Sequence, residues 1–234
     1  MDIDDKRIRD AVKHTEILRA PKQSLYTFGT TNIYYYLVTE PTYSELVKDI
    51  TETVIREGRV IAERPRIVTP YYLAGLEGFS TEARRYFEAL ARERGSNIHG
   101  LFYTYKNEPK DLTIVSDNLL SVVDKLNVEI DRRGDPLAAI IKGEDALWDV
   151  SLMKFIYEVT RSSLQDNIRQ LGSRGLLDID AAGIPSDARV RIEELFEQVT
   201  SGEREPGELK DELDRWGLFE EYEDRFFNLF KRKR

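Results

Sequence analysis

A long apolar stripe between residues 145 and 171 constrains the fold of this chain more than any other feature of its sequence. The apolar residues recur at spacings of three and four, which places them on one face of a helix. They are Leu147, Val150, Met153, Ile156, Tyr157, Leu164, Ile168 and Leu171. Gly172 and Gly175 follow, and glycines at such positions are typical of a helix end. We therefore predict a long central helix over residues 145–171 that is buried against much of the remaining chain.

Segments rich in β-branched and aromatic residues dominate the chain before residue 116 and predict strands. Because glycine suits a tight turn, Glu57-Gly58 predicts a two-residue hairpin between strands at 53–56 and 59–62. Further strands are predicted at 24–28, 32–38, 66–73, 98–105 and 112–115, with a loop at 29–31 and a turn at 107–109. These strands follow one another in hairpins and do not alternate with helices, which disfavours a parallel doubly-wound sheet.

Helical patterns dominate the chain after residue 116. Besides the central helix, apolar spacing and capping residues predict helices at 117–133, 186–202, 206–217 and 218–230, and a short apolar turn at 136–142. Two more helices are predicted earlier, at 4–19 and 80–95. The expected class is α+β, with an antiparallel, hairpin-rich N-terminal half packed on a helical C-terminal half. A soft boundary near residue 116 gives regions 1–115 and 116–234, which can equally belong to one domain.

The composition restricts the partners and the compartment that we expect. The chain has 234 residues, a net charge of −8 and no cysteine. A negative field opposes non-specific binding to nucleic acid or to an anionic membrane, and the lack of cysteine excludes disulfides and thiolate metal sites. No apolar run reaches the roughly 18 residues of a membrane span, and the charged residues 1–10 do not fit a secretory signal. We therefore expect a cytoplasmic protein without a membrane partner.

Common catalytic and cofactor motifs do not occur in the sequence. We find no phosphate-binding G-x-x-x-x-G-K or G-x-G-x-x-G, no G-x-S-x-G elbow and no H-E-x-x-H zinc motif. With only two histidines, a histidine-rich metal site is excluded. The residues from Asp178 onward begin like a calcium loop, but Arg189 stands where the loop needs a bidentate glutamate. We therefore predict no catalytic residue, no metal site and no cofactor.

Arginines and tyrosines near the predicted 57–58 hairpin are the candidates for ligand binding. The arginines cluster around the hairpin, two tyrosines alternate on the predicted 98–105 strand, and a histidine at its start could reach a cleft as a general base. The candidate residues are Arg56, Arg59, Arg64, Arg66, His99, Tyr103 and Tyr105. Such a surface can bind a phosphorylated small molecule or single-stranded nucleic acid. The alternative interpretation is that these arginines protect an exposed edge strand, because charged side chains there block edge-to-edge aggregation.

Two aromatic segments allow either a structural or a binding role. In Tyr34-Tyr35-Tyr36, the outer two tyrosines share one face of the predicted strand. Half-buried sheet residues are the simpler interpretation, and a stacking platform for bases or sugars is the alternative. The last predicted helix carries a stripe of Phe219, Tyr222, Phe226, Leu229 and Phe230. We expect this stripe to dock onto its own domain or onto a second subunit.

A non-enzymatic interaction or regulatory protein that forms a homo-oligomer is the function that the sequence favours. Long apolar helix stripes and the lack of catalytic motifs motivate this hypothesis. One alternative is a nucleic-acid-binding module, because residues 164–177 could form a recognition helix before a wing, although the net charge opposes it. The other is an enzyme or binding protein for a phosphorylated or sugar-like small molecule, using the arginines, the tyrosines and His99.

Overall fold

The computed structural model describes residues 3–45, 51–68, 76–77, 79–83, 85, 100–182 and 184–231. The chain divides into two compact units, the first made of Met1–Pro65 and Thr69–Ile168 and the second of Arg66–Val68 and Arg169–Arg234. Residue 116, where the sequence suggested a boundary, lies inside the first unit. A mixed sheet and long helices make up the described structure, which confirms the predicted α+β class.

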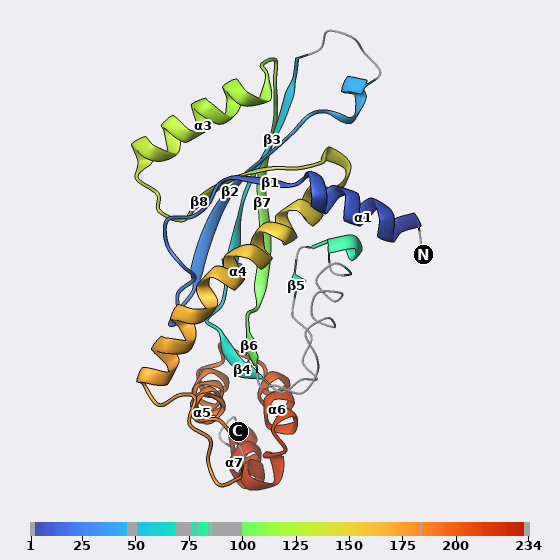
Figure 1. Ribbon diagram of the computed structural model, residues 1–234. Helices are drawn as coiled ribbons and strands as arrows, with labels where there is room; N and C mark the ends of the chain where they lie inside the picture. Colours follow the sequence, from blue (N-terminus) through green and yellow to red (C-terminus); the bar gives the residue numbers. More distant parts are fainter. Residues whose placement is uncertain are drawn as a thin grey trace. The chain divides into compact units, whose positions relative to one another are not determined.

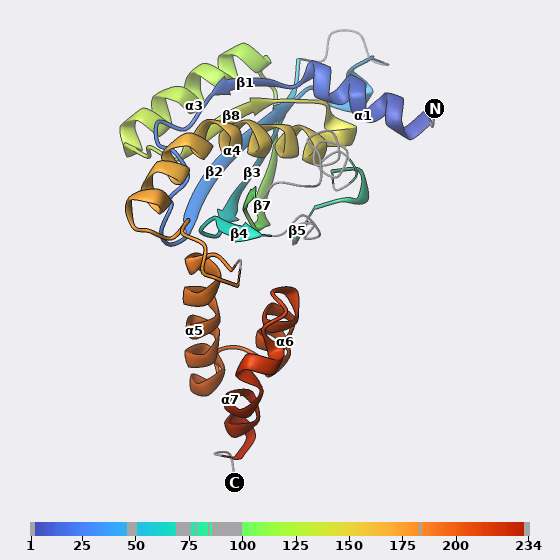
Figure 2. The ribbon, with the colours of Figure 1, turned by 60° about the horizontal axis from the view of Figure 1, so that its bottom comes forward.

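The first unit has a mixed sheet with helices on both faces (Figures 1 and 2). Its described strands are β1 (Glu16–Arg19), β2 (Thr31–Thr39), β3 (Thr53–Ala62), β5 (Leu76–Glu77), β6 (Gly100–Phe102), β7 (Tyr105–Val115) and β8 (Ala138–Lys142). Its described helices are α1 (Ile3–His14), α3 (Leu119–Arg133), most of α4 (Trp148–Ser173), and the short 3-10 turns η1 (Thr42–Glu45) and η2 (Asp145–Leu147). Six strands form one sheet in the order β1-β8-β2-β3-β7-β5.

Side-chain alternation along β2 explains why each face of the sheet is covered by a different helix. Ile33, Tyr35 and Leu37 face α4 and belong to a core with its apolar stripe. Tyr36 and Val38 face α3 and belong to a second core. The side chains that α3 contributes are Val122, Val123, Leu126 and Ile130. The predicted helix at 117–133 is thus confirmed as the cover of one face.

The long central helix is also confirmed, as η2 followed directly by α4. The α4 stripe packs on the sheet through Leu152, Met153, Phe155, Ile156 and Val159. Helix α1 packs on the start of α4, where Ile8 and Ala11 contact Leu147 and Val150. The first unit therefore consists of α3, the sheet, and α4 with α1, in three layers.

Strand β8 lies inside the sheet, where the sequence predicted only a short apolar turn. It pairs antiparallel with β1 and parallel with β2. Ala138 and Ile140 face α3, Ala139 and Ile141 belong to the α4 core, and all four are at most 3% exposed. A strand buried on both faces has no alternation of polar residues. This is why the prediction for residues 136–142 was wrong.

Strand β3 continues through Glu57-Gly58, so the predicted two-residue hairpin is wrong. Gly58 lies opposite Tyr35 in the β2–β3 register. A Cβ atom at Gly58 would lie 2.6 Å from Cζ of Tyr35 and 2.8 Å from the carbonyl oxygen of Glu108. The glycine is therefore required by the close approach of a tyrosine ring and a neighbouring backbone, and not by a turn.

Strand β7 is likewise continuous, so the predicted turn at 107–109 is wrong. The β3–β7 register pairs Glu57 with Asp111 and Gly58 with Pro109, which leaves Lys110 as the extra residue of a β-bulge. Proline is tolerated at a bulge because the ladder of hydrogen bonds is already interrupted there. Pro109 thus marks an irregularity within a strand and does not end it.

Two predictions near the N-terminus are also corrected. The predicted helix at 4–19 ends at His14, and its last residues instead form β1, where Ile17 pairs with Ile141. The predicted strand at 24–28 is not present, and β2 begins only at Thr31. In this segment the N–H of Leu25 donates to Oγ of Ser163 at 2.9 Å, so a side chain takes the place of a neighbouring strand.

The described part of the second unit contains three helices, α5 (Ser186–Ser201), α6 (Pro206–Arg215) and α7 (Phe219–Lys231), besides the end of α4 and the short strand β4 (Arg66–Val68). The three helices agree with the prediction to within a few residues. Gly202 has a φ of 81° and closes α5, and Pro206 opens α6. Their shared core is formed by Ile192, Leu195, Phe196, Leu209, Leu213, Trp216 and Phe226, among others.

Some predictions fall mostly or wholly outside the described residues. These are the later part of the strand at 66–73, most of the helix at 80–95, and His99 at the start of the strand at 98–105. Residues 81–83 and 85 are helical, as predicted. Within the described ranges, no helix has both the length and the hydropathy that crossing a membrane requires.

Candidate functional site

The arginines that the sequence singled out do not share one face of the sheet. Arg56 and Arg59 lie three residues apart on β3, and an odd spacing points side chains to opposite faces. Arg56 contacts the start of α4, whereas Arg59 is paired with Glu108 on the other face. Arg64 belongs to the first unit and Arg66 to the second. A binding role for His99, which lies outside the described residues, stays a prediction.

Tyr103 and Tyr105 attach α4 to the sheet. Their rings stack with centroids 6.2 Å apart, and they are 3% and 1% exposed. The hydroxyl of Tyr103 is hydrogen-bonded to the side chain of Asn167 at 2.9 Å, and that of Tyr105 to Thr160. Burial raises the pKa of Tyr103 to about 12 and raises the pKa of Tyr105 still further. Both side chains are committed to the core and offer little surface to a ligand.

Arg56 belongs to a polar cluster at the carboxyl ends of β2 and β8. Its guanidinium lies 2.7 Å from Oδ1 of Asp145 and 5.7 Å from the centre of the Trp148 ring. Thr39 and Thr42 donate to the same carboxylate at 3.0 and 2.9 Å. Burial raises the pKa of Asp145, but the donated hydrogen bonds outweigh burial and hold this pKa below its ordinary value. The polar groups of this cluster are therefore bonded to one another, and these bonds hold Asp145, just before α4, against the ends of the strands.

Arg59 lines a hollow on the α3 face of the sheet, which we call the sheet hollow. Its volume is about 430 Å³. It is lined by Tyr34, Tyr35, Tyr36, Glu57, Gly58, Arg59, Glu108, Pro109, Lys110 and Arg133. Strand register places Tyr34, Arg59 and Glu108 in one row across β2, β3 and β7. The β-bulge at Lys110 and the last turn of α3 complete the rim.

The cations of the sheet hollow are paired with nearby carboxylates. Arg59 lies 2.7 Å from Oε2 of Glu108, and this ion pair lowers the pKa of Glu108 and raises the pKa of Arg59. Arg133 donates to Oη of Tyr36 at 3.0 Å and is paired with Glu129. Lys110 lies 3.5 Å from Oδ2 of Asp111. The hollow therefore presents donors and acceptors side by side, with no strong excess of either sign of charge.

The second unit exposes aromatic side chains on α7. Phe219, Tyr222, Phe226 and Leu229 pack on the core of this unit, whereas Phe227 and Phe230 are each 48% exposed. The Phe227 ring lies edge-on to Phe219 and Phe226, with centroid distances of 6.3 and 5.8 Å. The sequence stripe on the last helix is thus only partly buried. The aromatic rings of α7 thus extend from the buried Phe226 to the exposed Phe227 and Phe230.

An apolar groove lies beside Phe230, and we call it the helix groove. Its volume is about 800 Å³. It is lined by Phe196, Glu197, Val199, Thr200, Ser201, Pro206, Arg225, Asn228, Leu229 and Phe230. The guanidinium of Arg225 lies 4.0 Å from the centre of the Phe196 ring and is paired with Glu193 at 2.7 Å. The groove is thus walled by α5 and α7 and lies next to the exposed face of α7.

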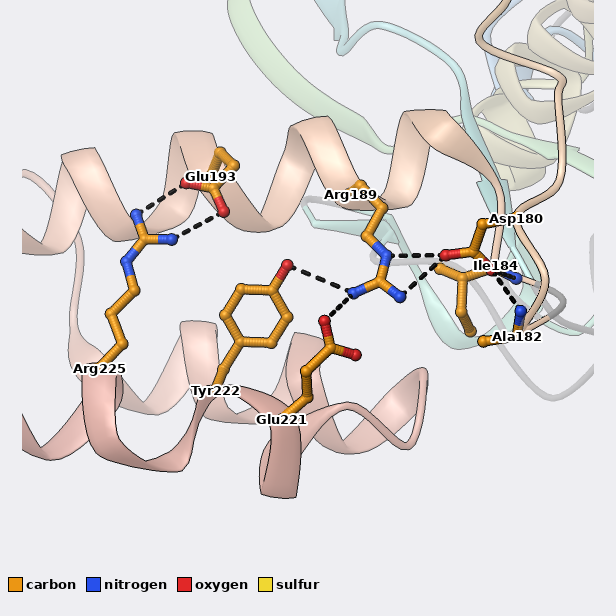
Figure 3. A network of polar contacts seen from close by, with 8 residues as sticks. All are labelled: Asp180, Ala182, Ile184, Arg189, Glu193, Glu221, Tyr222 and Arg225. Carbon is orange, nitrogen blue, oxygen red and sulfur yellow. Dashed lines mark hydrogen bonds and ion pairs between the residues drawn. The ribbon is translucent and has the colours of Figure 1, made fainter.

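A polar network holds α7 against α5 (Figure 3). Arg189 of α5 donates to Asp180 at 2.8 Å and to Glu221 at 2.6 Å, and Oη of Tyr222 accepts from it at 3.3 Å. Asp180 also accepts the backbone N–H groups of Ala182 and Ile184, both at 2.9 Å. Arg189, which stands where a calcium loop needs a glutamate, is therefore the ion-pair partner of Asp180. Nowhere in the described ranges do three or more histidine or acidic side chains form a group that could hold a metal ion.

Comparison of the chain with family models, curated proteins and solved structures gave no match. Sequence reasoning identified Arg59, the Tyr34-Tyr35-Tyr36 segment and the aromatic stripe of α7, but it missed Glu57, Glu108 and Arg133 as lining residues. These three come from β3, β7 and α3. The alternation of charged residues at 106, 108 and 110 was a signal for Glu108 alone.

Proposed function

We propose that the protein is a non-enzymatic interaction protein that self-associates through the exposed face of α7. The observation that carries this proposal is the 48% exposure of both Phe227 and Phe230 on a short, well-packed helix. Exposed aromatic side chains next to an apolar groove are typical of protein–protein contact surfaces. A cytoplasmic location is part of the same proposal and rests on the lack of cysteine.

The charge distribution along α7 favours a second copy of the chain as the partner. Glu220, Glu223 and Asp224 lie on the same stripe as Phe227, at spacings of three, four and seven residues. The sequence becomes basic at position 231. When two copies pack antiparallel about Phe227, position 223 of each lies opposite position 231 of the other. An acidic residue at position 223 then faces a basic residue at position 231. A two-fold axis makes this pairing of opposite charges occur twice, so the surface is complementary to itself.

The size of the surface predicts a dimer of moderate affinity. Helix α7 has 13 residues and is therefore about 20 Å long. Two such helices alone bury less than the roughly 1,200–2,000 Å² of a stable interface. The helix groove adds apolar surface beside Phe230 and increases the area that the partner can cover. We therefore expect a dissociation constant on the order of 10 μM.

Replacing Phe227 with serine is expected to weaken the dimer at least about tenfold, because the aromatic contact at the two-fold axis is lost. Sedimentation velocity over a range of protein concentrations measures this change directly. Glu223→Lys keeps the packing of Phe227 but places like charges opposite each other. It should also weaken the dimer, and the effect should shrink as salt is added.

Leu120→Ser is the matched control, because Leu120 is a 74% exposed apolar residue of α3 and lies outside the proposed interface. It should leave the association constant unchanged. A wild-type protein that remains monomeric at several hundred micromolar would overturn the proposal. So would a dimer that Phe227→Ser and Glu223→Lys do not weaken.

A further inference from the structure

The sheet hollow has the size of a small-molecule site. Its volume of about 430 Å³ falls within the roughly 300–1,000 Å³ of typical ligand pockets. All of its lining residues belong to the first unit. The hollow and the proposed self-association surface on α7 thus belong to different units of the chain.

Tyr34 offers an aromatic face at the hollow. Its side chain is 43% exposed, although its neighbours Tyr35 and Tyr36 are 1% and 8% exposed. It lies directly opposite Arg59 of the next strand in the β2–β3 register. A half-exposed tyrosine ring on a sheet is suited to stack on a flat apolar face of a ligand.

The charges around Tyr34 argue against an anionic ligand. Arg59 is already paired with Glu108, and Arg133 with Glu129. A phosphate would need to displace these carboxylates and would also lie near Glu57. The same ion pairs argue against a cationic ligand, because Arg59, Lys110 and Arg133 would repel it. A neutral ligand neither displaces the paired carboxylates nor is repelled by the cations.

A neutral polyhydroxylated ligand matches the mixture of donors and acceptors. Each hydroxyl group can donate one hydrogen bond and accept others. The guanidinium and ammonium groups of Arg59, Lys110 and Arg133 can donate to it, and the carboxylates of Glu57 and Glu108 can accept from it. A sugar ring combines such hydroxyls with an apolar C–H face for Tyr34. We propose that the sheet hollow binds a neutral saccharide, with Tyr34 as the stacking platform and Glu57, Arg59 and Glu108 as the hydrogen-bonding groups.

Saturation-transfer-difference NMR of the full chain tests this proposal with glucose, galactose, mannose, N-acetylglucosamine and maltose as probes. At least one of these sugars should receive magnetisation, with a dissociation constant on the order of millimolar, as expected for a shallow and open site. Tyr34→Ala should weaken binding at least about tenfold. Glu57→Gln should also weaken it, because an amide keeps the shape but replaces an acceptor oxygen with a donor group.

Tyr26→Ala is the matched control, because Tyr26 is also 43% exposed and is not part of the hollow. It should leave sugar binding unchanged, and circular dichroism should show all three variants folded. If no neutral sugar binds, the proposal is wrong. It is also wrong if binding survives Tyr34→Ala and Glu57→Gln, which would place the sugar elsewhere. If inorganic phosphate or glucose 6-phosphate binds while glucose does not, the hollow is an anion site and the proposal is overturned.

Discussion

Replacing Gly58 with alanine is expected to lower the free energy of unfolding by about 3 kcal/mol. The added Cβ atom would lie 2.6 Å from Cζ of Tyr35 and 2.8 Å from the carbonyl oxygen of Glu108. Both distances are shorter than van der Waals contact, and the second involves backbone that cannot move without disturbing β7. Chemical denaturation followed by circular dichroism measures the change.

Gly207→Ala is the control for this experiment, because a Cβ atom at Gly207 meets no atom within 4 Å. Alanine is a better helix former than glycine, so stability in α6 should stay the same or rise slightly. Tyr35→Leu in the Gly58→Ala background should recover about 1 kcal/mol relative to the sum of the single changes, since one of the two clashes is removed. Equal stability of Gly58→Ala and the wild type would show that Tyr35 does not require a glycine there.

Replacing Asp145 with alanine is expected to destabilise the fold by about 2–4 kcal/mol. The carboxylate accepts from Thr39 and Thr42 and is paired with Arg56, whose side chain is only 15% exposed. Without Asp145, this guanidinium loses the charge that compensates its burial. Asp111→Ala is the control, because the Lys110–Asp111 pair is largely exposed. It should change stability by less than about 1 kcal/mol.

The lowered pKa of Asp145 predicts how the stability of the fold changes as the pH falls. Its pKa in the folded state lies below the ordinary value, so the unfolded chain binds this proton more readily than the folded chain does. The stabilisation that ionised Asp145 contributes is complete above the pKa of an unfolded aspartate, about 3.9. It is lost as the pH falls through the folded pKa. Asp145→Asn should remove this part of the pH dependence, and an unchanged acid denaturation curve in the variant would contradict the assignment.

The helices were predictable from sequence because their signals are local. In α4 and α3, apolar residues recur with helical spacing, and glycines follow close behind the last turn. Pro206 and Gly202 mark the limits of α6 and α5 in the same way. Each of these signals depends on residues within a few positions of one another, so no knowledge of tertiary contacts was needed.

The strands and the sheet hollow were less predictable because their signals depend on partners far away in the chain. Gly58 looks like a turn residue until Tyr35 is known to lie across the neighbouring strand. Pro109 looks like a strand end until the bulge in β7 is seen. The hollow combines Tyr34, Arg59, Glu108 and Arg133 from four separate elements. Strand register places Tyr34, Arg59 and Glu108 in one row, and the packing of α3 on the sheet adds Arg133. The sequence states neither.

The buried tyrosine hydroxyls set an alkaline limit on this fold. Burial raises the pKa of Tyr35 and Tyr103 to about 12, and raises the pKa of Tyr105 further, whereas an unfolded tyrosine ionises near about 10. Their stabilisation is complete below about pH 10 and is lost as the pH rises through the folded pKa. Each hydroxyl can remove up to about 1.4 kcal/mol of stability per pH unit in that interval. The helical signal should therefore fall as the pH rises above about 10, whereas exposed tyrosines such as Tyr26, Tyr34 and Tyr43 can ionise while the fold stays intact.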